Sequence, residues 1–136
     1  MTSNLAVLQA LDIFFLVFHT LIILFNCLGW IHPKTRPWNL GLLLLTAASW
    51  FILGIWYGWG YCPCTDWHWQ VRSAMGRPIE TTSYIKFLIE TLTGADPNRF
   101  VVDAVTVGGL FVALGASITL NILDWRRRSP RRMAEA

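Results

Sequence analysis

Charge is the property that this sequence has least of. Only 14% of its 136 residues are charged, against roughly 25% in an ordinary soluble domain, whereas 54% are hydrophobic. Cysteine is also scarce, and three residues are too few for a disulfide-rich secreted scaffold. A chain this poor in charge cannot cover a water-facing surface, so a soluble enzyme and a disordered protein are both excluded.

Long hydrophobic runs are what the sequence has instead. Each of three runs is long enough to cross the roughly 30 Å hydrocarbon layer of a membrane, which takes about 20 residues. Pro33 and Pro37 close the first run, and Asp96 followed by Pro97 is typical of the N-cap of a third helix. We therefore predict an all-α membrane protein with three transmembrane helices, at about residues 5–31, 38–59 and 100–123, in a single membrane domain 1–125.

The basic residues lie mainly on one side of the predicted spans. Seven of the eleven fall in the first loop and in the basic tail 126–136. Because lysine and arginine near spans are retained in the cytoplasm, we expect the N-terminus outside and the C-terminus inside. The tail favours a contact with the anionic lipid of the bilayer over nucleic acid. The seven residues are Lys34, Arg36, Arg126, Arg127, Arg128, Arg131 and Arg132.

Residues 61–96 are predicted to form an external, amphipathic helical cap. A first short helix is expected to begin with Thr65 or Asp66 as its cap. A second is expected to start at Thr81, Thr82 or Ser83 and to stop at Gly94. The second helix has one apolar arc, so it is expected to lie flat in the outer interface or on the ends of the spans. That arc holds Tyr84, Ile85, Phe87, Leu88, Ile89 and Leu92.

The first span carries a polar stripe, Asp12, His19 and Asn26, at positions i, i+7 and i+14 of one helix side. A titratable residue deep in a bilayer is expensive, so His19 is expected to face the bundle interior and to hydrogen-bond with Thr46, Ser49 or a water. Two functional interpretations of His19 stay open beside this structural one. It is a candidate cofactor ligand, for haem iron, and a candidate member of a proton relay.

A second cluster, Cys62, Cys64, Asp66 and His68, combines sulfur, carboxylate and imidazole within seven residues. These are ligand types for zinc or copper, so the cluster is a candidate metal site. The Cys-x-Cys spacing is unusual for zinc, and Asp66 is also a candidate helix cap. A redox pair of thiols and a structural turn with buried thiols therefore remain alternatives.

Small residues repeat every four positions on the third span, at Gly109, Ala113 and Ser117. Such a face lets another helix backbone approach closely. It predicts helix packing, either inside this chain or with a membrane-protein partner.

His19, the segment 57–63, the segment 65–69 and the segment 83–88 together carry a family resemblance. Over about residues 9–123 the chain resembles a bacterial membrane family listed as domain of unknown function 2784. The resemblance implies a small multi-span protein of the bacterial inner membrane, with family-type positions at His19, Cys62 and Pro63. Cys64 departs from the pattern, in which a large apolar residue follows that proline. The family brings no established activity.

Two hypotheses on function follow. The sequence lacks a Walker loop, an HExxH motif, a Ser-His-Asp order and paired catalytic carboxylates, which favours a non-catalytic accessory or interaction subunit over an enzyme. The alternative is a membrane redox or cofactor- or metal-binding component built on His19 or on the Cys62, Cys64 and His68 cluster. The residues leave the identity of any cofactor open.

Overall fold

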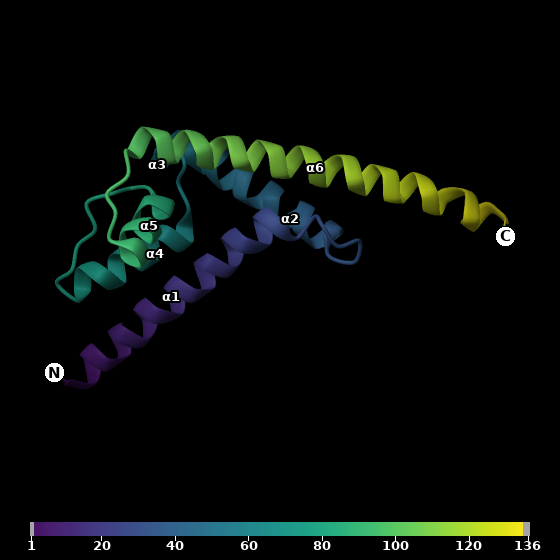
Figure 1. The fold of residues 1–136 in the computed structure, drawn as a ribbon. Coiled ribbons are helices and arrows are strands. Elements are labelled where there is room, and N and C mark those ends of the chain that lie inside the picture. Colours follow the sequence, from purple (N-terminus) through teal and green to yellow (C-terminus); the bar gives the residue numbers. More distant parts are fainter. Residues whose placement is uncertain (1, 135–136) are drawn as a thin grey trace.

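The computed structural model describes residues 2–134, and every element within this range is helical (Figure 1). Side chains are described for residues 4–128. Within the described residues three runs of helix are long and apolar enough to cross a membrane, which confirms the predicted fold class. The elements are α1 (Thr2–Leu28), α2 (Arg36–Ala48), the π-helical turn η1 (Ser49–Leu53), α3 (Gly54–Tyr57), α4 (Pro63–Ala74), α5 (Tyr84–Thr93) and α6 (Arg99–Ala134). The candidate spans are Asn4–Leu28, Arg36–Tyr57 and Arg99–Arg128.

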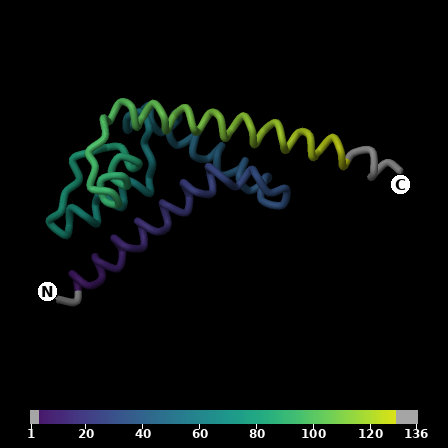
Figure 2. Tube along the Cα trace, viewed as in Figure 1, coloured from purple at the N-terminus to yellow at the C-terminus, as the bar shows by residue number. Residues whose placement is uncertain are grey.

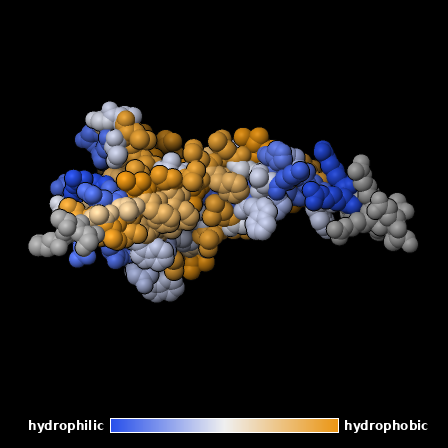
Figure 3. All heavy atoms as spheres, turned by 90° about the horizontal axis from the view of Figure 1, so that it is seen from below, coloured by the Kyte–Doolittle hydropathy of each residue, from blue (hydrophilic) through white to orange (hydrophobic). Residues whose placement is uncertain are grey.

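The surface is hydrophobic around its middle and hydrophilic toward its two ends (Figure 3). Large apolar side chains of all three candidate spans are exposed, among them Phe14, Leu45 and Val112. In a membrane such side chains meet lipid chains, which are as apolar as they are. We name the end that holds α4 and α5 the cap end, and the end that holds residues 29–35 the loop end.

The cap fills a wedge between two diverging helices (Figure 1; Figure 2). Helix α2 packs along α6, whereas α1 diverges from α6 toward the cap end, with α4 against α1 and α5 against α6. The buried face of α5, formed by Tyr84, Phe87 and Leu88, packs against Leu16 and Ile23. We expected the cap to lie in the outer interface or on the ends of the spans. Helix α5 instead contacts residues in the middle of α1.

Helix α4 starts earlier than predicted. It begins at Pro63, with Cys62 as the flanking residue, so Thr65 and Asp66 lie inside its first turns instead of capping it. Proline suits the first turn of a helix because its missing amide would have no partner there. The negative charge of Asp66 in the first turn still stabilises α4 by its interaction with the positive end of the helix dipole.

Helix α6 is capped by a different residue from the one predicted. Asn98 Oδ1 accepts hydrogen bonds from the amides of Phe100 and Val101, at 2.9 and 3.4 Å. Asp96 instead pairs with Lys86 of α5. The residue that caps α6 is therefore Asn98, two residues after Asp96.

Other helix ends differ by a few residues. Helix α1 ends at Leu28, short of residue 31, and Pro37 lies in the first turn of α2. Helix α6 continues to Ala134, so the basic tail extends the third span as one helix. The side chains of Arg131 and Arg132 and residues 135–136 lie outside the described residues.

Candidate functional site

Asp12 of α1 is bound by two side chains of α4. Its Oδ1 lies 2.8 Å from His68 Nε2, and Arg72 Nη1 lies 3.0 Å from Oδ1 and 3.3 Å from Oδ2. His68 and Arg72 are four residues apart on α4, so they face α1 together. The His68 side chain is fully buried, and those of Asp12 and Arg72 are each 19% exposed. The Asp12 carboxylate is thereby paired with an imidazole and a guanidinium of a neighbouring helix.

Tyr84, the first residue of α5, extends this network. Its hydroxyl lies 3.2 Å from His68 Nδ1 and 3.4 Å from the carbonyl oxygen of Phe15. The hydroxyl proton therefore has two alternative acceptors. His19 of α1 stacks on the Tyr84 ring, with centroids 3.8 Å apart and planes inclined by 12°.

Hydrogen-bond partners and burial together determine the protonation of His68. The Asp12 carboxylate accepts a hydrogen bond, so Nε2 carries a proton, and in the neutral imidazole Nδ1 accepts from the Tyr84 hydroxyl. Burial lowers the pKa of His68, since the imidazolium is poorly solvated there, and Asp12 opposes this shift only in part. Burial also raises the pKa of Tyr84. The imidazole and the phenol are therefore both neutral at pH 7, between one carboxylate and one guanidinium.

Aromatic rings enclose the network. Trp69 stacks on Tyr84 with centroids 5.3 Å apart, and its indole nitrogen donates to the carbonyl oxygen of Thr81 at 3.1 Å. The guanidinium of Arg72 lies 5.0 Å from the centre of the Phe87 ring. Trp69 and Phe87 also contact the His68 ring, and such an apolar surrounding strengthens the electrostatic interactions of the groups packed in it.

The polar stripe of α1 has a different partner at each position. Asp12 binds α4, and His19 stacks on Tyr84. Asn26 donates from Nδ2 to Thr46 Oγ1 of α2 at 3.0 Å. The sequence predicted that the stripe faces inward, and all three residues do face other helices.

The partners expected for His19 are occupied by other groups. Thr46 accepts from Asn26, and Ser49 Oγ donates to the carbonyl oxygen of Tyr61 at 2.8 Å. His19 is buried as expected, but its contact is a ring of the cap. The hydrogen bond predicted to Thr46 or Ser49 is therefore wrong.

Five buried polar atoms have no hydrogen-bond partner in the described part of the chain, and two of them, on His19 and Asn26, belong to this stripe. Such atoms are rare in proteins, because each costs about 1–3 kcal/mol when left unpaired, and internal water is their usual partner. They are His19 Nδ1, Asn26 Oδ1, Trp30 Nε1, Asn39 Oδ1 and Arg72 Nε.

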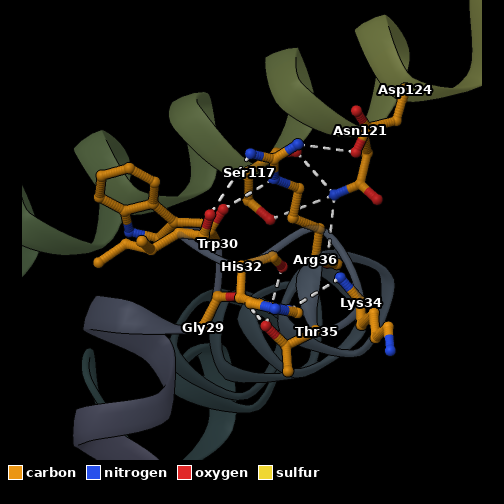
Figure 4. A network of polar contacts seen from close by, with 10 residues as sticks. Gly29, Trp30, His32, Lys34, Thr35, Arg36, Ser117, Asn121 and Asp124 are labelled. Carbon is orange, nitrogen blue, oxygen red and sulfur yellow. Dashed lines mark hydrogen bonds and ion pairs between the residues drawn. The ribbon is translucent and has the colours of Figure 1, made fainter. Parts of the chain in front are cut away.

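A second polar network closes the loop end (Figure 4). Arg36 Nη1 pairs with Asp124 Oδ2 of α6 at 2.8 Å, and Arg36 Nε donates to the carbonyl oxygen of Trp30 at 2.9 Å. Asn121 Nδ2 donates to the carbonyl oxygen of Arg36 at 3.1 Å. Arg36 thus joins the loop, α2 and α6.

The end of α1 is closed by side chains from beyond it. Asn39 Nδ2 donates to the carbonyl oxygen of Phe25 at 2.6 Å, and Thr35 Oγ1 donates to that of Gly29 at 2.6 Å. The Phe25 carbonyl thus has a second donor beside the amide of Gly29 at 2.8 Å, and the Gly29 carbonyl, just beyond α1, has a side-chain donor. A Cβ at Gly29 would lie 2.6 Å from Phe25 O and 2.8 Å from Asn39 Nδ2, so this position has room for glycine alone.

The structure does not bring the predicted metal ligands together. His68 turns toward Asp12, away from any ligand set with Cys62, Cys64 and Asp66, and the described residues hold no group of three or more metal-binding side chains. Both thiols of the segment are free and half-buried. Burial and the adjacent Cys62 raise the pKa of Cys64.

The small residues of the third span differ in burial. Ala113 and Ser117 are buried, and Ala113 packs in a cluster with Leu43 of α2 and Leu110. Nothing lies within 4 Å of a Cβ built at Gly109, so this residue takes no part in packing within the chain.

Sequence reasoning missed Arg72 and Tyr84 as site residues. A signal for Arg72 was present, because it follows His68 by four residues and shares its helix face. Tyr84 was assigned only to the apolar arc of its helix. Its role depends on the docking of α5 beside His68, which no local pattern indicates.

Three comparisons with known proteins complete these observations. A family model described as a protein of unknown function (DUF2784) matches residues 9–122, a range that holds the whole cap-end network. No curated protein and no solved structure matches the chain.

Proposed function

We propose that this chain, which belongs to the DUF2784 family of proteins of unknown function, carries protons along a buried polar path between its three membrane-spanning helices. The observation that carries the proposal is the row of polar side chains on the inward face of α1, two of which, His19 and Asn26, have a buried atom without a partner among the described residues. Ionisable residues among spans commonly mark proton relays.

The cap-end network supplies the first step. His68 Nδ1 takes up a proton, and the Asp12 carboxylate at Nε2 stabilises the resulting imidazolium. After the Tyr84 hydroxyl has turned from His68 toward the carbonyl of Phe15, its oxygen takes the proton from His68 Nδ1 while the hydroxyl gives its own proton to a bridging water, so that His68 and Tyr84 both end neutral. Because burial lowers the pKa of His68, the imidazole releases its proton again instead of retaining it.

The stripe of α1 extends the path toward the loop end. Asp12 and Asn26 are 14 residues apart, which is about 21 Å along a helix and most of the hydrocarbon layer. His19 stands halfway between them, with Nδ1 unpaired. It stacks on Tyr84 without a hydrogen bond, so water must bridge the two for a proton to pass.

Proton flux into vesicles tests the proposal. The full chain is reconstituted into liposomes that contain a pH-sensitive dye, and a potassium diffusion potential drives protons inward. Wild-type vesicles should acidify faster than protein-free vesicles, and Tyr84→Phe and His68→Gln should reduce the rate to that of protein-free vesicles. Tyr57→Phe is the matched control, because this phenol is exposed and lies outside the path. Equal rates for wild type and Tyr84→Phe would refute the proposal.

A second candidate function, an accessory subunit of a larger membrane assembly, is favoured by the sparse packing of the spans. Only 6% of the most apolar window of α1 is buried within the chain, and 22% of that of α6. On α6 a Cβ at Gly108 or Gly115 would meet nothing within 4 Å. Gly108→Leu with Gly115→Leu should therefore abolish association with a partner subunit without altering the thermal stability of the isolated chain.

The orientation is proposed from charge alone. We place the chain in the bacterial inner membrane, with the N-terminus and the cap outside and the loop end in the cytoplasm. In a Cys27→Ala background, an impermeant thiol reagent should label Cys62 and Cys64 on intact spheroplasts. Labelling at alkaline pH offsets the raised pKa of Cys64. Labelling only after lysis would reverse the orientation.

A further inference from the structure

The loop end carries a basic face whose only acidic neighbour is already engaged. Asp124 is the one acidic side chain that the structure describes at this end, and it is paired with Arg36 at 2.8 Å. The remaining basic side chains here are exposed, and no other carboxylate among the described side chains opposes them. They are Lys34, Arg126, Arg127 and Arg128.

The Arg36–Asp124 pair also sets the position of this face. It ties the loop that carries Lys34 to the part of α6 that carries the three arginines, so both contribute to the same end of the molecule (Figure 3; Figure 4). Because α6 continues as a helix through this region, the arginines are held in order just beyond the apolar part of the span.

Two exposed tryptophans border the basic face. Trp38 lies in the first turn of α2 and is 78% exposed. Trp125 directly precedes the arginines and is 70% exposed. Indole rings concentrate at the headgroup level of membranes, where one edge is apolar and the other wet. They place the basic side chains at the depth of lipid phosphates.

We propose that the loop end is a binding surface for anionic phospholipid headgroups, formed by Lys34 and Arg126–Arg128 between Trp38 and Trp125. Each arginine offers a planar donor fork that matches phosphate oxygens. The surface fits lipid better than nucleic acid, since the flanking indoles sit at the apolar boundary and not on a polar groove. This assignment does not depend on proton transfer at the cap end.

Native mass spectrometry of the full chain in detergent, titrated with phosphatidylglycerol or phosphatidylcholine, tests the surface. Each basic side chain near an anionic lipid surface contributes about fivefold in affinity, so Arg127→Gln with Arg128→Gln should weaken phosphatidylglycerol binding about 25-fold. Binding of phosphatidylcholine should be unchanged. Because the attraction is electrostatic, 0.5 M salt should weaken the wild-type preference in the same direction.

Arg77→Gln with Arg99→Gln is the matched control. It removes the same charge from two exposed side chains at the cap end, and it should leave phosphatidylglycerol binding unchanged. Equal affinity of the wild type for the two lipids, or an equal loss in the control variant, would overturn the proposal. Tighter binding of a short single-stranded RNA that depends on Arg127 and Arg128 would overturn it in favour of a nucleic-acid surface.

Discussion

At the cap end, Asp12 is bound only by side chains, His68 and Arg72 of α4, whereas at the loop end Arg36 of α2 bonds to backbone carbonyls of the loop as well as to Asp124 of α6. Two of the acceptors of Arg36, the carbonyls of Trp30 and Ile31, belong to the backbone. The cap-end network therefore consists of groups that titrate, and the loop-end network mostly of groups that do not.

This difference separates two roles. Backbone carbonyls keep their acceptor strength at any pH, so they suit a permanent closure of helix ends. Imidazole, phenol and carboxylate change charge with pH and with proton supply, so they suit a site that acts. Trp69 and Phe87 pack against the network at the cap end. In such an apolar surrounding the attraction between paired charges is stronger, and so is the energetic cost of leaving one of them unpaired. The cap end should therefore respond most strongly to loss of one partner.

Asp12→Leu should have the largest effect. It leaves the Arg72 guanidinium and His68 Nε2 facing an apolar wedge without an acceptor, and breaking a mostly buried ion pair in this way costs about 3 kcal/mol. Thermal unfolding of the full chain in detergent, followed by circular dichroism, measures the loss.

The double variant Asp12→Leu with Arg72→Leu sharpens this test. Because both charges are removed, no uncompensated ion remains, and the double variant should be more stable than Asp12→Leu alone. Additive losses in the two single variants would mean that the two side chains do not act as a pair.

Gly29→Ala should have the next largest effect, at the loop end. The new Cβ would lie 2.6 Å from the carbonyl oxygen of Phe25 and displace Asn39 Nδ2 from its bond, which should cost about 2 kcal/mol. Gly41→Ala is the matched control within a helix. Nothing lies within 4 Å of its Cβ, so it should be neutral or slightly stabilising. Equal unfolding temperatures for Gly29→Ala and Gly41→Ala would contradict the close packing of Gly29 against Phe25 and Asn39.

Tyr84→Phe should have a smaller effect on stability. It keeps the ring that stacks on His19 and removes only the hydroxyl that His68 accepts from, which should cost about 1 kcal/mol. The ¹⁵N chemical shift of His68 Nδ1 in labelled protein reports the lost bond directly. A shift identical to that of the wild type would show that the hydroxyl does not donate there.

Acid should produce the smallest of these effects, and only at the cap end. The folded protein has a lowered His68 pKa, so below the ordinary value of 6.5 the unfolded chain binds the proton more readily and stability falls as pH drops. Above that value the contribution of His68 is constant. Between pH 7.5 and 5.5 the unfolding temperature of His68→Gln should fall by less than that of the wild type. Asp12, Arg72 and Tyr84, which surround His68, are the same in both proteins. An identical pH dependence would exclude His68 as the titrating group.

The helical plan follows from local sequence to a large degree. The apolar runs predict three spans, and Gly94, at φ +71°, ends α5 as expected. Lys86 and Glu90, four residues apart on α5, pair at 2.9 Å. Each of these features depends on neighbours in the chain, within one or two helical turns. The predicted cap of α6 was wrong, because Asp96 pairs with Lys86, ten residues earlier in the chain, and Asn98 caps the helix instead.

The inward polar stripe and its partners separate what each level of structure decided. The sequence by itself determined that Asp12, His19 and Asn26 share one side of a helix, because helical periodicity alone fixes that. It also determined that this side avoids lipid, because the cost of exposing a charge to hydrocarbon is independent of the fold. Only the tertiary structure decided that Asp12 binds His68 and Arg72, 56 and 60 residues away. The choice depends on how α4 docks into the wedge beside α1, and that docking is the sum of many weak contacts that no local pattern contains.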